Sequence, residues 1–152
     1  RFNYWKSSLL SSLSDQAIDS LVEGYRHANS PFSSILVEHL GGAMSRVAPD
    51  ETAFPHRNAP FDVVIMPMWA DRAESATHIQ WADELWRTLQ PFSTGGVYVN
   101  YLGHEGDDRV RASYGSNYAR LVELKNKYDP LNLFCINQNI RPSTVDATQV
   151  RG

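Results

Sequence analysis

The chain has 152 residues, of which 42% are hydrophobic, 20% charged and 11% aromatic, a composition typical of a folded globular domain. With a single cysteine, Cys135, this composition excludes a disordered tail, a collagen-like repeat and a disulfide scaffold. Fourteen Lys and Arg against seventeen Asp and Glu give a net charge of -3. No overall positive field attracts phosphate backbones, so we expect no nucleic-acid partner.

The sequence begins at Arg1 without an initiator Met and without a signal-peptide pattern. We therefore expect a chain cut from a longer protein. No stretch approaches the roughly 18 consecutive apolar residues that cross a bilayer, so we expect a soluble protein without a membrane partner. The sequence leaves cytoplasmic and secreted locations open.

The first half of the chain predicts one helix and several strands. Ser14 or Asp15 can cap a helix over residues 14–28, which the proline at 31 follows. Residues 33–40 are rich in β-branched and apolar side chains and predict a strand. Its alternation assigns Leu36, Glu38 and Leu40 to one face and Ile35, Val37 and His39 to the other.

The remaining elements are expected to alternate between strands and helices. Pro67 cannot donate to a ladder, so it predicts an edge position or a bulge near the end of its strand. Trp81 and Trp86 are expected to pack in the core or against a partner. The further expected segments are short strand 43–47, strand 61–69, helix 75–89, strand 97–102, polar loop 103–108, helix 116–129, extended segment 134–140 and loose tail 143–152. The predicted class is α+β, a mostly antiparallel sheet covered by helices.

Two strand segments carry polar groups that could support chemistry. Glu38 lies among apolar neighbours; a buried carboxylate could accept a proton at neutral pH, whereas an edge-strand Glu is simply solvated. In Tyr98-Val99-Asn100-Tyr101, a phenol could act as a base if its phenolate is stabilised, and the Asn100 amide could bind a planar heterocycle. Alternatively, these are ordinary strand residues. The residues alone leave both alternatives open. No metal-binding motif occurs, so no metal is expected.

Several motifs in order resemble the C-terminal signature of the berberine bridge enzyme-like flavoproteins, FAD-linked oxidases of the vanillyl-alcohol oxidase type. The matching segments are Gly41-Gly42, 52–57, Trp69, 98–101, 114–121, 125–134 and 137–142. The resemblance implies the second half of a substrate domain over residues 1–103, a C-terminal segment over 104–142 that returns to the FAD domain, and a flexible tail over 143–152.

The resemblance also implies roles for individual residues. Tyr101 matches the catalytic base of many members, and Glu38 matches an active-site position held by a carboxylate base or a tyrosine. The implied cofactor-binding residues are Asn100, Tyr98, Gln138, Asn137 and Asn139. Adjacent strand residues face opposite ways, so Asn100 and Tyr101 reach one site only if the strand ends or twists there.

Three further residues are expected to be structural. His56 and Arg57 could meet an anion, but we favour a structural loop in which Arg57 bonds to nearby carbonyls. Cys135 is expected to be buried and inert, because the cysteine that attaches flavin in this family lies in the part not included here.

The resemblance implies part of an FAD-dependent oxidase that moves a hydride from a C–H bond next to oxygen or nitrogen to FAD, with O2 as acceptor. Its implied partners are a small-molecule substrate, such as an alcohol, a sugar or a natural product, and the FAD-binding domain of the same protein, missing here. The chain alone is then expected to be inactive. The alternative is a non-catalytic binding or interaction module.

Overall fold

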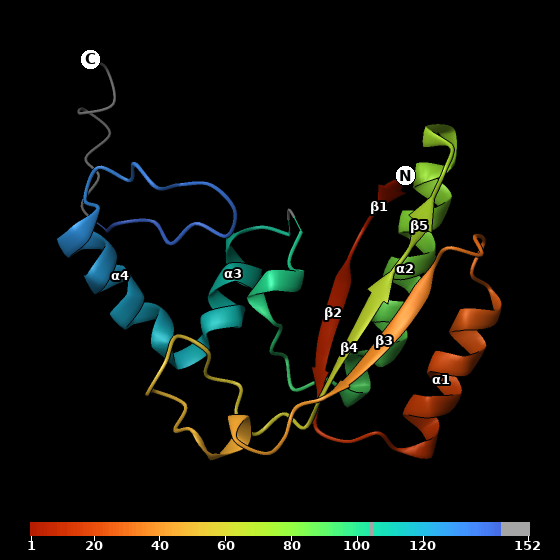
Figure 1. Cartoon of the computed structure of the whole chain (residues 1–152), viewed down its shortest axis with the longest axis horizontal. Coiled ribbons are helices and arrows are strands. Elements are labelled where there is room, and N and C mark those ends of the chain that lie inside the picture. Colours follow the sequence, from red (N-terminus) through yellow and green to blue (C-terminus); the bar gives the residue numbers. More distant parts are fainter. Residues whose placement is uncertain (104, 144–152) are drawn as a thin grey trace.

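The computed structural model describes residues 1–103 and 105–143 (Figure 1). The expected tail over 143–152 lies outside the described residues except for Ser143. The strands are β1 (Phe2–Asn3), β2 (Lys6–Leu10), β3 (Ser34–His39), β4 (Phe61–Met66) and β5 (Met68–Trp69); the α-helices are α1 (Asp15–Arg26), α2 (Ser75–Leu89), α3 (Asp107–Tyr114) and α4 (Tyr118–Tyr128). This arrangement confirms the predicted α+β class.

The main sheet has three antiparallel strands in the order β2-β4-β3, so β4 is central and β3 forms one edge. Phe2 pairs with Trp69 in a second, two-stranded ladder of β1 and β5. Pro67 separates β4 from β5, and its carbonyl accepts the Tyr4 amide at 3.2 Å. The predicted strand over 61–69 therefore forms as two strands that divide at the proline, where an edge position or a bulge was expected.

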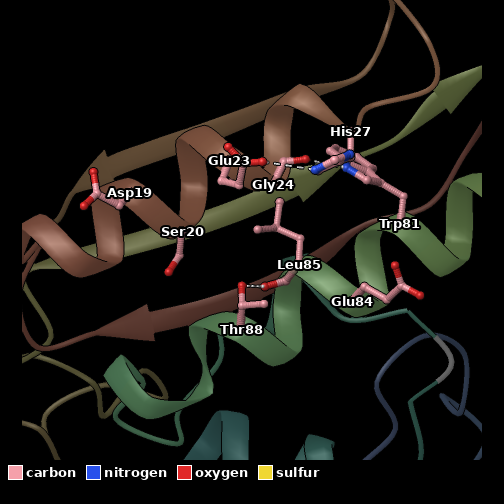
Figure 2. Close-up of a pocket in the computed structure, with 9 residues that line it drawn as sticks. All are labelled: Asp19, Ser20, Glu23, Gly24, His27, Trp81, Glu84, Leu85 and Thr88. Atoms are coloured by element: carbon pink, nitrogen blue, oxygen red, sulfur yellow. Dashed lines mark hydrogen bonds and ion pairs between the residues drawn. The ribbon is translucent and has the colours of Figure 1, made fainter.

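The two long helices pack against each other beside the sheet. Ser14 caps α1, since its hydroxyl accepts the Ala17 amide at 3.2 Å. Trp81 of α2 donates its indole N–H to the Gly24 carbonyl of α1 at 2.8 Å, and Leu85 points at the same glycine (Figure 2). A Cβ added to Gly24 would lie 2.4 Å from Leu85 Cδ1. The close contact between α1 and α2 therefore requires a residue without a side chain at position 24.

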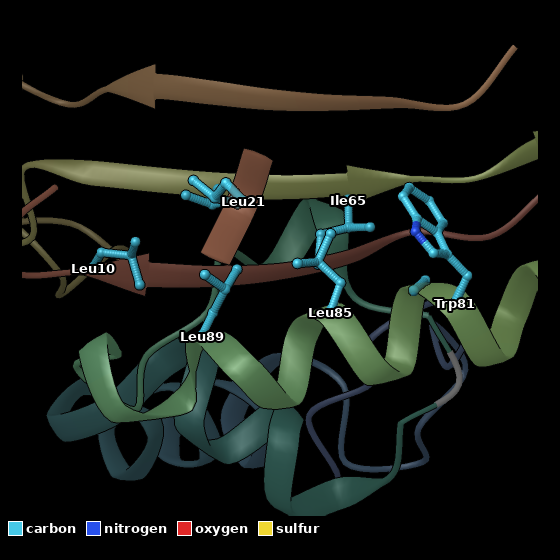
Figure 3. Packing of buried hydrophobic residues seen from close by; sticks show 8 residues of the cluster. Leu10, Leu21, Ile65, Trp81, Leu85 and Leu89 are labelled. Carbon is cyan, nitrogen blue, oxygen red and sulfur yellow. The ribbon is translucent and has the colours of Figure 1, made fainter. Parts of the chain in front are cut away.

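The core lies between this helix pair and one face of the sheet. Leu10, Val63 and Ile65 from the strands meet Leu21 of α1 and the apolar face of α2 (Figure 3). The buried α2 members are Trp81, Ala82, Leu85 and Leu89, and Trp86 packs at the margin of this cluster. The helical spacing of residues 75–89 and the packing roles of both tryptophans are thus confirmed.

A smaller unit holds α3 and α4 to one side of the sheet (Figure 1). Its buried cluster consists of Val97, Leu102 and Val110. The loop before β4 is tied to this unit, because Asn117 donates to the carbonyls of Pro49 and Thr52 at 2.6 and 2.9 Å. His56 Nε2 lies 3.0 Å from the Ala112 carbonyl. These bonds fix the loop over 47–60.

Four local predictions are wrong. Residues 97–102 form no strand. Val97 and Leu102 are both buried in the same cluster, and the chain between them makes a 3-10 turn over Val99–Tyr101. The predicted strand 43–47 is instead a 3-10 turn over Met44–Arg46. The predicted loop 103–108 ends early, because Asp107 and Asp108 begin a helix, α3, which buries only Val110 and Ser113 and so has a weak apolar pattern. Cys135 is exposed, not buried.

Gly24 gives a test of the helix contact. Gly24→Ala should lower the free energy of unfolding by about 1–3 kcal/mol, because a new methyl group forces Leu85 to move. Alanine is otherwise the better helix former by about 1 kcal/mol. Urea denaturation measures the change. Gln16→Ala, exposed on the same helix, is the control and should stay within about 0.5 kcal/mol of wild type; a stabilised Gly24→Ala would contradict the contact.

Candidate active site

The site begins on the sheet face that the two helices leave uncovered. Alternation along the strands sends Val63 and Ile65 into the core, so their neighbour Asp62 points to the opposite face. Glu38 lies directly across from Asp62 in the β3–β4 register. The expected alternation along 33–40 is confirmed, and it brings two carboxyl groups together on one face.

The 3-10 turn over Val99–Tyr101 supplies the aromatic side of the site. Residues three apart in a 3-10 turn lie on the same side, and the rings of Tyr98 and Tyr101 accordingly meet edge to face at 5.3 Å. The Tyr101 hydroxyl donates a hydrogen bond to Glu38 Oε2 at 3.1 Å. The structure thus joins the two residues expected to be catalytic, which lie 63 positions apart.

Further aromatic rings surround this pair. The Trp5 ring lies 5.7 Å from that of Tyr101, and Phe54 meets Tyr98 edge to face at 5.6 Å. A pocket of about 350 Å³ lies at this place. Its lining residues are Glu38, Leu40, Met44, Phe54, Arg57, Asp62, Tyr98 and Tyr101. The pocket is largely apolar and aromatic, with convergent polar groups at one end, as small-molecule sites usually are.

Arg57 lies at the wall of this pocket, but its guanidinium group is engaged in the loop. It donates to the Met44 carbonyl at 3.2 Å and to the Thr52 hydroxyl, and it stacks on Phe54. This agrees with the expected structural role of Arg57. The same contacts hold two pocket residues, Met44 and Phe54, in place.

Asp62 is a site residue that the sequence analysis missed. Its side chain is 1% exposed, and neither carboxyl oxygen has a hydrogen-bond partner among the described residues. Burial, and then the charge of Glu38, raise the pKa of Asp62 from 3.8 to about 7. The nearby Ser7 hydroxyl acts in the opposite direction, although it makes no hydrogen bond of normal geometry. An aspartate within an otherwise apolar strand was the available signal.

Tyr101 is a poor free base in this setting. Burial raises the pKa of its hydroxyl to about 12, and the hydrogen bond to Glu38 and the negative charge there add to the increase. At neutral pH the phenol therefore keeps its proton and points it at a carboxylate. This arrangement suits a relay that passes a proton onward to Glu38.

Three of the five expected cofactor-binding residues, Asn100, Asn137 and Gln138, line a different pocket beside the same turn. Asn100 donates to the Tyr98 hydroxyl at 2.8 Å and faces a second pocket of about 440 Å³, which Asn137 and Gln138 also line. Gln138 donates to the Leu102 carbonyl at 2.7 Å. Asn139 lines a neighbouring pocket with these two residues, and its buried Oδ1 has no partner among the described residues. Tyr98 lines the first pocket, with Glu38 and Tyr101. Asn139 does not line the pocket that Asn100 faces.

Segment 134–140 is irregular, with no strand, and Asn137 has a left-handed backbone at φ 61°. Asp129 organises the turn before it by accepting the amides of Leu133 and Phe134 at 2.7 and 3.0 Å. The carboxylate of Asp129 therefore fixes the turn that follows α4. The side chains of Leu133, Phe134 and Ile136 are left 74%, 81% and 82% exposed.

A larger pocket, of about 470 Å³, lies between α1 and α2 but has no comparable arrangement (Figure 2). Its carboxylate Glu23 is paired with Arg26 at 2.8 Å and with His27 at 3.2 Å. Within residues 1–103 and 105–143, no group of three potential metal ligands occurs. Over the same residues no helix is long and apolar enough to span a membrane.

Comparison with known proteins identifies proteins that are similar to this chain. The family described as "Berberine and berberine like" matches residues 97–141. This range includes the 3-10 turn over Val99–Tyr101, called the tyrosine turn below, and the irregular segment 134–140. The FAD-linked oxidoreductase YgaK of Bacillus subtilis is 37% identical over 130 residues, covering 86% of this chain and 29% of the relative. Berberine bridge enzyme-like C-1 of Nicotiana tabacum is 33% identical and covers 89% of this chain and 29% of the relative.

Solved structures give the same result for the fold. A glycopeptide hexose oxidase in complex with teicoplanin superposes with a TM-score of 0.81 at 26% identity, covering 92% of this chain and 32% of that one. A chitooligosaccharide oxidase gives 0.77 at 26% identity over the same shares. The chain is thus similar, over most of its length, to berberine bridge enzyme-like FAD-linked oxidoreductases. It spans about 29% of the length of the curated relatives it matches.

The raised pKa of Asp62 predicts a pH-dependent stability. In the unfolded chain this carboxyl ionises near its ordinary 3.8, whereas the folded chain holds the proton up to about 7. The folded state therefore loses stability as the pH rises through this window. Asp62→Asn removes this pH-dependent loss. The free energy of unfolding of the variant should therefore equal that of wild type near pH 4 and exceed it by on the order of 1–3 kcal/mol at pH 8.

Urea denaturation at both pH values checks this prediction. Asp50→Asn, an exposed aspartate in the loop before β4, is the matched control and should leave the stability curve within about 0.5 kcal/mol at either pH. An Asp62→Asn variant whose difference from wild type is the same at pH 4 and pH 8 would contradict the raised pKa.

Proposed function

We propose that this chain forms the substrate side of the active site of an FAD-dependent oxidase. The observation that supports this most is the hydrogen bond from Tyr101 to Glu38 at the end of an aromatic pocket. When bound, FAD would accept a hydride from a substrate C–H bond next to oxygen or nitrogen, with dioxygen as the final electron acceptor.

The residues of the chain then handle the proton. A substrate hydroxyl or amine in the pocket would hydrogen-bond to the Tyr101 oxygen. As the substrate's C–H bond breaks, its O–H or N–H proton passes to Tyr101 while the Tyr101 proton passes to Glu38, 3.1 Å away. Glu38 is the final acceptor because the pKa of Tyr101 is too high for a stable phenolate. The carboxyl group then releases the proton to solvent.

The amide-lined pocket fits the cofactor. Asn100, Asn137 and Gln138 offer both donors and acceptors, which suit the edge of a flavin ring. Asn139 adds a buried oxygen without a partner among the described residues, which a ligand donor would satisfy. We assign these residues, with Tyr98 holding Asn100 in place, as the group that contacts FAD.

The partner of the chain would be the FAD-binding part of the same protein. Leu131, Leu133, Phe134 and Ile136 are exposed apolar side chains close together in the chain after α4, at and just before the irregular segment, and apolar side chains gathered in this way usually mark an interface. The same segment carries Asn137 and Gln138. Docking of a second part would therefore bury the apolar surface and close the amide-lined pocket together.

The substrate is a small molecule. The pocket's Tyr98, Phe54 and Met44 offer flat and flexible apolar contacts, which suit the apolar faces of a sugar or an aromatic natural product. We propose an alcohol, a sugar or a natural-product intermediate. A non-catalytic interaction module is the second candidate, because the exposed apolar surface alone would also support association.

The relay predicts a rate effect at Tyr101. Tyr101→Phe in the full-length protein should lower the rate of anaerobic flavin reduction by about 10²-fold or more, the usual contribution of a positioned proton acceptor. Glu38→Gln should lower it comparably, since it removes the acceptor. Stopped-flow absorbance of the flavin measures the rate. Tyr25→Phe on α1, distant from the pocket, is the control; reduction at the wild-type rate in Tyr101→Phe would exclude the relay.

The apolar surface predicts an effect on flavin content. Phe134→Asp should lower the amount of flavin bound per protein severalfold, because a charge in the interface opposes docking of the FAD-binding part. Ile18→Asp, on the outer side of α1 and 43% exposed, should leave it unchanged. The flavin absorbance of the purified full-length protein is the measurement. A colourless wild-type protein that binds no added FAD would favour the interaction module.

A further inference from the structure

Asp62 is a buried acid that the proton relay described above does not use. It is 1% exposed, it lies opposite Glu38 in the β3–β4 register, and it lines the same pocket as Tyr101. Both of its carboxyl oxygens lack hydrogen-bond partners among the described residues. An ionised carboxylate in this place would be costly, and an orphaned acid in a native fold requires an explanation.

The charged and titratable groups around Asp62 come from several elements. Glu38 faces it from β3, Arg57 from the loop before β4, and Tyr98 and Tyr101 from the 3-10 turn; Ser7 is the polar neighbour on β2. The guanidinium of Arg57 is already bound to Met44 and Thr52. Directly opposed residues in an antiparallel pair have Cβ atoms roughly 5 Å apart, so the charge of Glu38 acts on Asp62 at close range.

We propose that Asp62 is a positioning residue for proton transfer: it stays protonated beside Glu38, so that the facing pair carries one negative charge and Glu38 alone receives the proton of Tyr101. This inference rests on the proposed function. A neutral Asp62 leaves Glu38 as the single carboxylate that can accept from Tyr101. Two adjacent charges would compete for the same hydroxyl and for any cation in the pocket.

The electrostatics of the pocket agree with this assignment. Burial and the charge of Glu38 raise the pKa of Asp62 to about 7, and a charge on Asp62 would in turn raise the pKa of Tyr101. Asp62 is therefore protonated below about pH 7 and ionises as the pH rises through this value. Its ionisation adds a second negative charge to the pocket. The proton of Tyr101 then has two carboxylates beside it, Glu38 and Asp62, where the protonated form of Asp62 leaves only one.

The first test observes the proton directly and needs no turnover. Infrared spectroscopy of the full-length protein with its FAD should show a protonated-carboxyl band that is lost as the pH rises through about 7. The band should be missing in Asp62→Asn. In Glu38→Gln it should be lost at a lower pH than in wild type, because the charge that raises the pKa of Asp62 is gone. A wild-type protein without such a band, or a band retained in Asp62→Asn, would overturn the proposal.

The second test connects this proton to the reaction. The pH profile of flavin reduction should have an inflection near pH 7 in wild type and lose it in Asp62→Asn, since the amide is a permanent mimic of the neutral acid. Ser7→Ala, which removes a neighbour that does not titrate, should keep the inflection. A residue that only supports the fold would change stability and leave the inflection in place, and that result would overturn the proposal.

The two readouts separate the possible failures. If Tyr101→Phe is fully active while the infrared band behaves as expected, the proposed relay is wrong and the protonated state of Asp62 stands. If Tyr101→Phe is slow and the band is unaffected by Asp62→Asn, the relay stands and the role of Asp62 is wrong.

Discussion

The central strand β4 has neighbours on both edges and contacts on both faces, and the rest of the structure depends on this constraint. One face must be apolar to meet α1 and α2, and Val63 and Ile65 meet that requirement. Asp62 and Val64, which alternate with them, then necessarily point to the other face. Asp62 is held there by the pleat of the strand, since its carboxyl group has no hydrogen-bond partner among the described residues. The same packing that stabilises the fold thus forces a carboxyl group to stay in an unfavourable environment, next to Glu38.

The elements with strong periodic signals could be predicted from the sequence. Helix α2 has an apolar stripe with a period that fits one buried face, and β3 alternates cleanly, so both were identified with nearly their observed limits. The capped start of α1 was equally readable, because Ser14 precedes a regular pattern. In each case local preference and burial favour the same conformation.

The tyrosine turn could not be placed from local preference alone. Residues 97–102 alternate β-branched and aromatic side chains, yet the burial of Val97 and Leu102 against Val110 depends on α3, which has too few apolar residues to be recognised. Even in this turn, Tyr101 lines the pocket of Glu38, whereas Asn100 lines the pocket of Asn137 and Gln138. The resemblance to a family located Tyr101 and Glu38, but Asp62 required the sheet register, because nothing in the sequence indicates which residue of β4 faces residue 38.

The position of β3 at the edge of the sheet has a consequence for how the pocket is bounded. Glu38 lies on this edge strand, and the backbone of an edge strand is a template on which another strand can be added. A segment that pairs there would place its own side chains beside Leu36 and Glu38, on the face that carries the pocket. A strand added at this edge would therefore extend the face that carries the pocket beyond Glu38, next to the residue that accepts the Tyr101 hydrogen bond.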